Sequence, residues 1–307
     1  MAEAASRHGP ARVVISGASG LIGKRVSAAL AASGTTVVPL VRSRQTQASA
    51  GIPWDPERGV IAREALEDCA AVVHLAGENV AQRWTDAARQ RIRTSRVAAT
   101  TLLATTLAGL VRRPRVLVCA SAVGWYGDTG ERLVTENDAN AADFLATVCR
   151  DWEAAAEAAR KAGIRVVHLR FGMILAKEGG ALAEMLPAFR WGAGGPVGSG
   201  RQWVSWIAAA DAVTVIRCAL DDDRWSGAIN TVAPEPIRQG DFAATLGAVL
   251  HRPAIAPLPG FAVGLLFGDM GRTLLLGSSR IAPGKLRELG FAWKFPDLSG
   301  ALAHAVA

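Results

Sequence analysis

Short runs of apolar residues alternate along the chain with longer, alanine-rich stretches. Six of the runs are nearly continuous in β-branched and other apolar residues: RVVISG, TTVVPLV, AAVVHLAG, RVLVCAS, RVVHLRFG and AINTVA. Unbroken apolar runs of this length are typical of parallel strands covered on both faces. The pattern therefore predicts strands at residues 12–17, 35–41, 70–77, 115–121, 165–172 and 228–233.

The stretches between these runs predict helices at residues 24–34, 86–110 and 143–163. The first and third end at Gly34 and Gly163, and glycine is favoured just after the last helical residue. Strands that alternate with helices form right-handed βαβ units. We therefore expect an α/β fold, a Rossmann-type doubly wound parallel sheet with a small C-terminal substrate lobe.

The amino-acid composition changes after Gly172. GAGGPVGSGRQWVSWI is rich in glycine, and from about residue 236 Pro, Gly and Leu mix without a strong strand pattern. We predict a Rossmann domain at 11–235 and a small lobe at 236–307, placed over the carboxyl ends of the strands, where ligands bind in open α/β sheets.

Composition excludes several classes of protein. The 307 residues are 50% hydrophobic and 20% charged, and no apolar stretch is long enough to span a bilayer. The net charge is +7, but the arginines are spread along the chain without a basic tail. The N-terminus lacks the apolar region of a secretory signal. We therefore expect a cytoplasmic protein with no nucleic-acid and no membrane partner, and a homodimer stays open.

The four cysteines and five histidines show no metal-binding spacing. Neither C-x-x-C nor H-E-x-x-H occurs, and three of the cysteines lie inside apolar or helical segments. Reduced structural thiols and no metal site are the better interpretation.

A glycine-rich turn follows the first predicted strand and opens the first helix. Gly17, Gly20 and Gly23 have the spacing G-x-x-G-x-x-G, which permits a tight turn and brings backbone N–H groups close to a pyrophosphate. The motif predicts a dinucleotide site whose contact residues are Gly17, Ser19, Gly20, Leu21, Ile22 and Gly23.

The end of the second strand selects the cofactor. An NAD site normally offers an acidic residue there, whereas this chain has Arg42 and Arg44, which suit a 2′-phosphate. The sequence therefore favours NADP(H) over NAD. Solvent-facing arginines at a strand end are the alternative.

Several stretches resemble a known family. The three glycines followed by DCAAVVHLAG, SAVGWYG and RVVHLRFG resemble the extended short-chain dehydrogenase/reductase superfamily. HLAGENVAQRW, RTSRVAAT, CRDWEAAA, GGPVGSGRQWVSWI, APEPI, HRPAIAPLP and PGKLRELGF are similar to its atypical, YfcH-type epimerase-like family. The likeness runs from about Arg12 to the C-terminus.

The resemblance implies an NADP(H) site with further contacts. It places Leu75, Ala76 and Gly77 under the adenosine and ribose, and adds Arg96 as a contact. Two departures concern the substrate lobe: Ala208 stands where relatives often have His, and GSSRIAP differs from the usual Gly-Gln-Arg pattern.

The usual chemistry of the superfamily requires a tyrosine and a lysine four residues later. The corresponding helix offers Phe144 or Leu145, then Val148 or Cys149, and no Y-x-x-x-K occurs anywhere. The standard pair is therefore absent.

Ser121 and Tyr126 remain as candidate catalytic residues. Ser121 occupies the place of the superfamily's catalytic Ser/Thr, where it can hydrogen-bond a substrate carbonyl or be structural. Tyr126 is the only tyrosine. Nothing nearby in the sequence would lower its pKa of about 10, so lining the pocket is favoured over acid catalysis.

Other polar and aromatic residues carry weaker signals. Asp211 is best interpreted as a helix N-cap, and Arg89 and Arg93 as a solvated helix face. Trp203 and Trp206 fit ligand stacking and a packed lobe interface equally well. Glu78 and Asn79 are expected to face the substrate.

Three hypotheses for the function follow. The first is an NADP(H)-dependent, epimerase-like oxidoreductase with altered proton transfer and an unidentified small-molecule substrate. The second is a regulator that senses NADP(H) without turnover, as the cell-division-inhibitor label of some relatives would suggest. The third, a nucleotide-sugar epimerase, is weakened by the missing Tyr/Lys pair.

Gly20→Val is expected to abolish cofactor binding and to leave the fold largely intact, because the side chain would block the approach to the pyrophosphate. Circular dichroism and NADPH titration measure the two effects. A variant with a native spectrum and unchanged NADPH affinity would show that the glycines serve only the turn.

Overall fold

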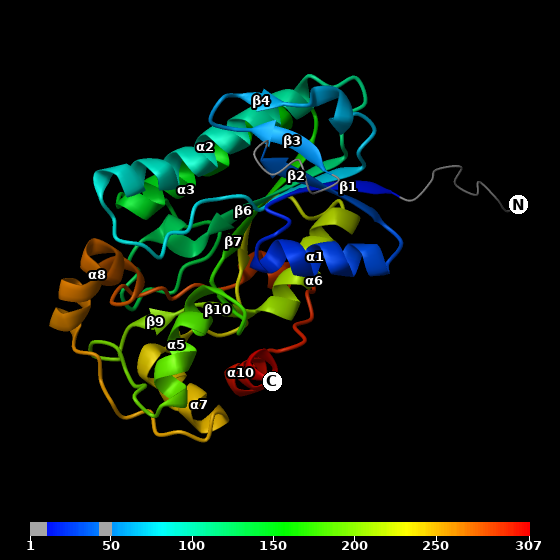
Figure 1. Ribbon diagram of the computed structural model, residues 1–307. Coiled ribbons are helices and arrows are strands. Elements are labelled where there is room, and N and C mark those ends of the chain that lie inside the picture. Colours follow the sequence, from blue (N-terminus) through cyan, green and yellow to red (C-terminus); the bar gives the residue numbers. More distant parts are fainter. Residues whose placement is uncertain (1–10, 43–50) are drawn as a thin grey trace, which may run out of the picture.

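The chain folds into one large sheet, two small sheets and the helices around them (Figure 1). The computed structural model describes residues 11–42 and 51–307. Its strands are β1 (Arg12–Ser16), β2 (Thr36–Arg42), β3 (Ile52–Asp55), β4 (Val60–Ile61), β5 (Ala71–His74), β6 (Val116–Ala122), β7 (Arg165–Phe171), β8 (Met173–Leu175), β9 (Trp203–Val204), β10 (Trp206–Ala208), β11 (Gly227–Thr231) and β12 (Ile237–Arg238). Its α-helices are α1 (Leu21–Ala32), α2 (Asp86–Ala108), α3 (Phe144–Ala154), α4 (Glu157–Lys161), α5 (Gly180–Arg190), α6 (Ala209–Asp221), α7 (Gln239–Val249), α8 (Gly260–Leu274), α9 (Gly284–Glu288) and α10 (Leu298–Val306); η2 (Arg63–Leu66) and η3 (Val123–Tyr126) are 3-10 helices.

The large sheet has the strand order β11-β7-β6-β5-β1-β2-β3-β4. All neighbouring strands are parallel except β3 and β4. The chain builds outward from β1 through β2 and β3, then returns to the other side of β1 with β5. All six predicted strands lie in this sheet, and the doubly wound Rossmann-type fold is confirmed. In such sheets ligands bind outside the carboxyl ends of the strands where the order reverses, here β1 and β5.

Helices cover both faces of the sheet, and the strands supply apolar side chains to each. Val14 and Val72 face one core together with Leu103 of α2, whereas Ile15 faces the other with Val26 of α1. Figure 1 shows α2 and α3 on one side of the sheet and α1 and α6 on the other. Since successive strand residues point to opposite faces, both cores together require the unbroken apolar runs of the sequence.

The predicted helix ends at two glycines are correct, but one predicted helix is interrupted in the structure. Gly34 and Gly163 follow the ends of α1 and α4 with φ of +80° and +85°, as glycine permits. The single helix predicted at 143–163 is two helices, α3 and α4. Ala156 N–H donates to the carbonyl of Glu153, three residues back, which tightens the turn between them. No Gly or Pro marks that break.

A separate apolar core lies in the small lobe, below the sheet in Figure 1. It combines α5, α7 and α10 with the strands β8 and β10. Leu182 and Trp206 precede residue 235, whereas Phe242 and Leu302 follow it, so both sides of the predicted boundary contribute to one core. Within 11–42 and 51–307, no helix combines the length and the hydropathy needed to cross a membrane.

Asp211 joins the small lobe to the helices of the sheet. The N-cap of α6 is Ala208, and Asp211 lies in the first turn, so its prediction as an N-cap is wrong. Its carboxylate accepts the backbone N–H groups of Lys294 (2.7 Å) and Phe295 (3.0 Å). The side chain is buried, and burial raises its pKa. Asp211 therefore fixes the segment that leads into α10.

Asp211→Ala is expected to lower the free energy of unfolding by about 2–4 kcal/mol, because two buried N–H donors lose their acceptor. Urea denaturation with an unchanged slope measures the loss. Asp241→Ala, at an exposed acid in the first turn of α7, is the matched control and should cost about 0.5 kcal/mol. Equal losses in the two variants would contradict the role of Asp211.

Candidate functional site

The glycine turn packs directly on the end of β5. Gly17 has φ +70°, and a Cβ there would lie 2.8 Å from the carbonyl carbon of Leu75. A Cβ at Gly23 would lie 2.1 Å from the carbonyl oxygen of Gly17. Gly20 is exposed, and its nearest obstacle is that same oxygen at 3.2 Å. The fold therefore requires Gly17 and Gly23, whereas Gly20 is exposed and a Cβ there would meet a single backbone oxygen.

The first turn of α1 offers unpaired backbone donors. Its N-cap is Gly20, no side chain caps it, and no acidic residue lies in the first turn. Ser19 is exposed and Leu21 half-buried, whereas Ile22 packs into the core. Ile22 therefore faces this site only through its backbone. Uncapped N–H groups at a helix N-terminus, beside a glycine that leaves room, suit a pyrophosphate.

The predicted contacts that follow β5 lie against this turn. Leu75 N–H donates to the backbone oxygen of Ser16 (3.1 Å), and Leu75 and Ala76 N–H both reach its Oγ (3.2 and 3.3 Å). A Cβ on Gly77 would lie 3.4 Å from the Arg96 guanidinium carbon. The structure thus brings together the predicted residues of the turn after β1, of the segment after β5 and of α2.

Arg96 has structural partners of its own. It donates to the carbonyls of Ile92 and Glu78 (both 3.0 Å), and its guanidinium carbon lies 5.0 Å from the ring centroid of Trp152. Burial lowers its pKa. A contact between Arg96 and a cofactor stays a prediction, but the arginine lies beside Gly77, at the edge of the sheet where the cofactor is expected.

Arg42 is the last residue of β2 and is exposed. Because β2 runs parallel to β1 with Leu40 opposite Ser16, Arg42 stands at the same carboxyl edge as the glycine turn. Arg44 lies outside the described residues.

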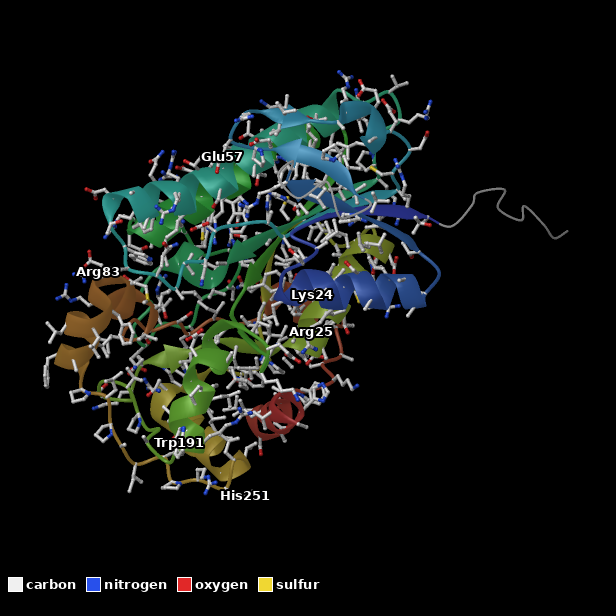
Figure 2. The ribbon with its side chains drawn as sticks, viewed as in Figure 1. Lys24, Arg25, Glu57, Arg83, Trp191 and His251 are labelled. Atoms are coloured by element: carbon white, nitrogen blue, oxygen red, sulfur yellow. The ribbon has the colours of Figure 1, made fainter. Side chains whose placement is uncertain are left out.

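A segment of the small lobe lies beside the start of α1, next to the glycine turn. A Cβ on Gly179 would lie 3.8 Å from Leu21, and Arg25 pairs with Glu178 at 2.7 Å. Figure 2 shows Arg25 on the side of α1 that faces the small lobe. The segment before α5 therefore borders the start of α1.

Ser121 lies at the end of β6 in a buried ionic cluster. Its hydroxyl, 3% exposed as a residue, donates to Glu153 Oε1 at 2.7 Å. Arg170 of β7 donates to both oxygens of the same carboxylate, at 2.8 and 2.9 Å. Sequence reasoning missed Glu153 and Arg170. The available signal was an arginine inside the apolar strand RVVHLRF, since a buried charge requires a partner.

Tyr126 belongs to the same cluster. Its hydroxyl accepts from Arg170 Nη1 (2.8 Å) and donates to Asn230 Oδ1 (2.7 Å). Burial raises its pKa to about 12, and the nearby arginine only partly opposes this. The pKa of Tyr126 is therefore not lowered, and its shift goes away from neutrality. An immobilised phenol of this kind serves structure better than proton exchange.

The helix positions that would hold the superfamily's tyrosine and lysine face the end of β6. A Cβ on Gly124 would lie 3.5 Å from Leu145 Cβ and 3.8 Å from Cys149 Sγ. Of the four candidate residues, Leu145 and Cys149 are thus the two that lie against Gly124. Burial raises the pKa of Cys149 to about 12, so a neutral thiol stands in place of an ammonium. All four cysteines are free, and within 11–42 and 51–307 no group of His, Cys, Asp or Glu is placed to hold a metal.

The rim of the site contains a second set of contacts. Arg89 lies over Trp84 and Phe144, 5.5 and 4.9 Å from their ring centroids, and pairs with Asp269 of α8 at 2.8 Å. The Arg89 side chain is 31% exposed, so this helix face is solvated only in part. Arg93 pairs with Asp151 and is half-exposed.

The remaining candidates divide between surface and core. Glu78 lies 3.6 Å from Arg91, and Asn79 accepts the N–H of Ala81. Trp206 is buried in the core of the small lobe. Trp203 lies between two guanidinium groups, with Arg238 at 3.9 Å and Arg280 at 4.4 Å from its ring centroid.

The whole-chain comparisons agree with this geometry. Residues 13–231 match the model of the NAD dependent epimerase/dehydratase family. The chain belongs to this family. The C-terminal part of this epimerase-family chain, 258–305, matches a domain of unknown function, DUF1731. The resemblance seen in the sequence is therefore confirmed.

Relatives match over almost the entire length. Epimerase family protein MT2273 of Mycobacterium tuberculosis is 40% identical over 294 residues, covering 95% of this chain and 97% of the relative. Human epimerase family protein SDR39U1 is 34% identical over 303 residues, covering 96% and 100%.

Two solved structures are similar in both fold and sequence. The crystal structure of human SDR39U1 (isoform 2) with NADPH has a TM-score of 0.87 at 32% identity, covering 96% of this chain and 98% of that one. A nucleoside-diphosphate sugar epimerase from Corynebacterium glutamicum has a TM-score of 0.79 at 35% identity, covering 97% of this chain and 58% of that one.

Glu153→Gln is expected to lower the free energy of unfolding by about 3 kcal/mol, because it leaves the buried Arg170 guanidinium without a countercharge. Tyr126→Phe should cost about 1–2 kcal/mol through its lost hydrogen bonds. Urea denaturation measures both. Asp151→Asn, on the same helix as Glu153, weakens the surface pairs with Arg93 and Arg150 and, as the control, should cost about 0.5 kcal/mol. A loss as small in Glu153→Gln would contradict a buried ion pair.

Proposed function

We propose that this chain binds NADP(H) across the carboxyl ends of β1, β2 and β5, and acts as an oxidoreductase on a small molecule. The observation that carries the proposal is the glycine turn. Gly17 and Gly23 let it pack on β5 and α1, while the exposed Gly20 is the N-cap of α1. Within 11–42 and 51–307 no side chain caps the backbone donors of that first turn, and a pyrophosphate would accept from them.

The preference for NADP(H) rests on Arg42. Arg42 is exposed at the end of β2, beyond which an NAD site would offer a carboxylate to the ribose hydroxyls. A cation there suits the 2′-phosphate instead. The NADPH named in the structure of human SDR39U1, which is similar over the whole chain, supports the same choice.

The chemistry that NADP(H) supplies when bound is hydride transfer. The residues at the end of β6 then decide how a proton moves. Ser121 already donates its proton to Glu153, and the Tyr126 hydroxyl is held between Arg170 and Asn230. For Ser121 to orient a substrate carbonyl, its hydroxyl must turn away from Glu153. Tyr126 orients the cluster and donates no proton to substrate.

A second candidate function is NADP(H) sensing without turnover. The observation that favours it is the pair Leu145 and Cys149 at the positions facing Gly124, where neither side chain exchanges protons near neutrality. The same pair disfavours a nucleotide-sugar epimerase, which needs acid–base groups there. Single-turnover oxidation of bound NADPH with a panel of carbonyl and quinone acceptors separates the two candidates.

Arg42→Ala is expected to weaken NADPH binding by about ten- to hundred-fold and to leave NADH binding unchanged, because a charge-assisted contact contributes about 1.5–3 kcal/mol. Calorimetric titration of both cofactors measures this. Arg58→Ala removes the same charge from the exposed turn between β3 and β4 and is the matched control. Equal affinity of the wild type for NADPH and NADH, or an unchanged preference in Arg42→Ala, would contradict the assignment.

A further inference from the structure

A buried chain of hydrogen bonds runs beneath the proposed cofactor edge, from β1 to α3. Ser16 Oγ lies 2.6 Å from His74 Nδ1, and His74 Nε2 lies 2.9 Å from Thr100 Oγ1. Trp152 Nε1 donates to the same Thr100 oxygen at 3.0 Å. Ser16 and His74 have no exposed surface. The proposed function uses none of these four side chains.

The direction of the first bond follows from counting donors. Ser16 Oγ has two lone pairs, and the N–H groups of Leu75 and Ala76 both point at them. Backbone N–H groups only donate, so the Ser16 hydroxyl must give its own proton to His74 Nδ1. His74 Nδ1 is therefore an acceptor.

The second bond fixes the tautomer. With Nδ1 accepting, neutral His74 carries its proton on Nε2 and donates it to Thr100 Oγ1. The other lone pair of that oxygen takes the indole N–H of Trp152, which is also an obligate donor. Complete burial lowers the pKa of His74 to about 4, consistent with a neutral ring. One arrangement of protons satisfies every bond.

The far end of the chain returns to the segment after β5. Arg96 lies over the Trp152 ring and donates to the carbonyl of Glu78. Ser95 Oγ accepts the N–H of Glu78 at 3.0 Å. Residues 75–78 are thus held from one side by Ser16 and from the other by α2. This is the segment on which the Gly17 turn rests.

We propose that His74 is a positioning residue for the dinucleotide: by accepting the Ser16 hydroxyl proton, it sets the spacing between the glycine turn and the end of β5. The inference rests on the proposed NADP(H) site. If the Ser16 hydroxyl rotates, Ala76 N–H loses this acceptor and Leu75 N–H keeps only the carbonyl oxygen of Ser16, so the backbone after β5 is held less tightly against the glycine turn. The adenosine and ribose positions then shift for NADPH and NADH alike.

Two substitutions at one position separate positioning from mere stability. In His74→Asn the side-chain oxygen lies near the place of Nδ1 and still accepts from Ser16. In His74→Gln the amide reaches the place of Nε2, which keeps the bond to Thr100 but not the one to Ser16. Each variant keeps one half of the chain and loses the other, so both should lower the melting temperature.

Calorimetric titration with NADPH and with NADH is the measurement. We expect His74→Gln and Ser16→Ala to weaken both cofactors about ten-fold with the NADPH preference unchanged, and His74→Asn to stay within about three-fold of the wild type. Equal affinities in His74→Asn and His74→Gln, or losses that follow the melting temperature alone, would overturn the proposal. Wild-type protein that binds neither cofactor would overturn the proposed function and this inference with it.

Discussion

The buried guanidinium of Arg170 determines the arrangement of the site around the end of β6. A charge in the middle of a parallel sheet is stable only when it is paired and hydrogen-bonded. Glu153 supplies the countercharge from α3, and Ser121 and Tyr126 complete the donors and acceptors. Asn230 extends the cluster to β11. One ion pair thus fixes how β6, β7, α3 and η3 meet, and it accounts for the only tyrosine of the chain.

Sequence reasoning succeeded wherever the determinant is local. The six long strands follow from apolar runs that both cores demand, and the glycine turn follows from spacing within seven residues. Gly34 and Gly163 ended their helices as expected. The short strands β8, β9, β10 and β12 have no such signal because each spans only two or three residues.

Interactions between residues far apart in the sequence could not be predicted, because their determinants are not local. Asp211 looks like a helix cap, but its partners come 83 and 84 residues later. Arg170 inside an apolar strand indicates that a buried partner exists, but the sequence does not identify it. In the sequence, Glu153 resembles any other acidic residue on a helix surface. Arg89 pairs with Asp269 across 180 residues. In each case the residue type was informative and the partner depended on the tertiary fold.

The shared core of the small lobe has a consequence for biosynthesis. Chains emerge N-terminus first, and a domain folds once its core residues are available. Leu182 and Trp206 pack with Leu298 and Leu302 of α10, so their apolar surfaces wait for about a hundred residues of further translation, several seconds at ordinary ribosomal rates. The last strand of the Rossmann sheet, β11, is translated earlier, but the core on one face of that sheet also includes Leu286 and Phe291. Both cores are therefore completed only when the C-terminal segments emerge, and translation of the last helices closes the two parts of the molecule almost together.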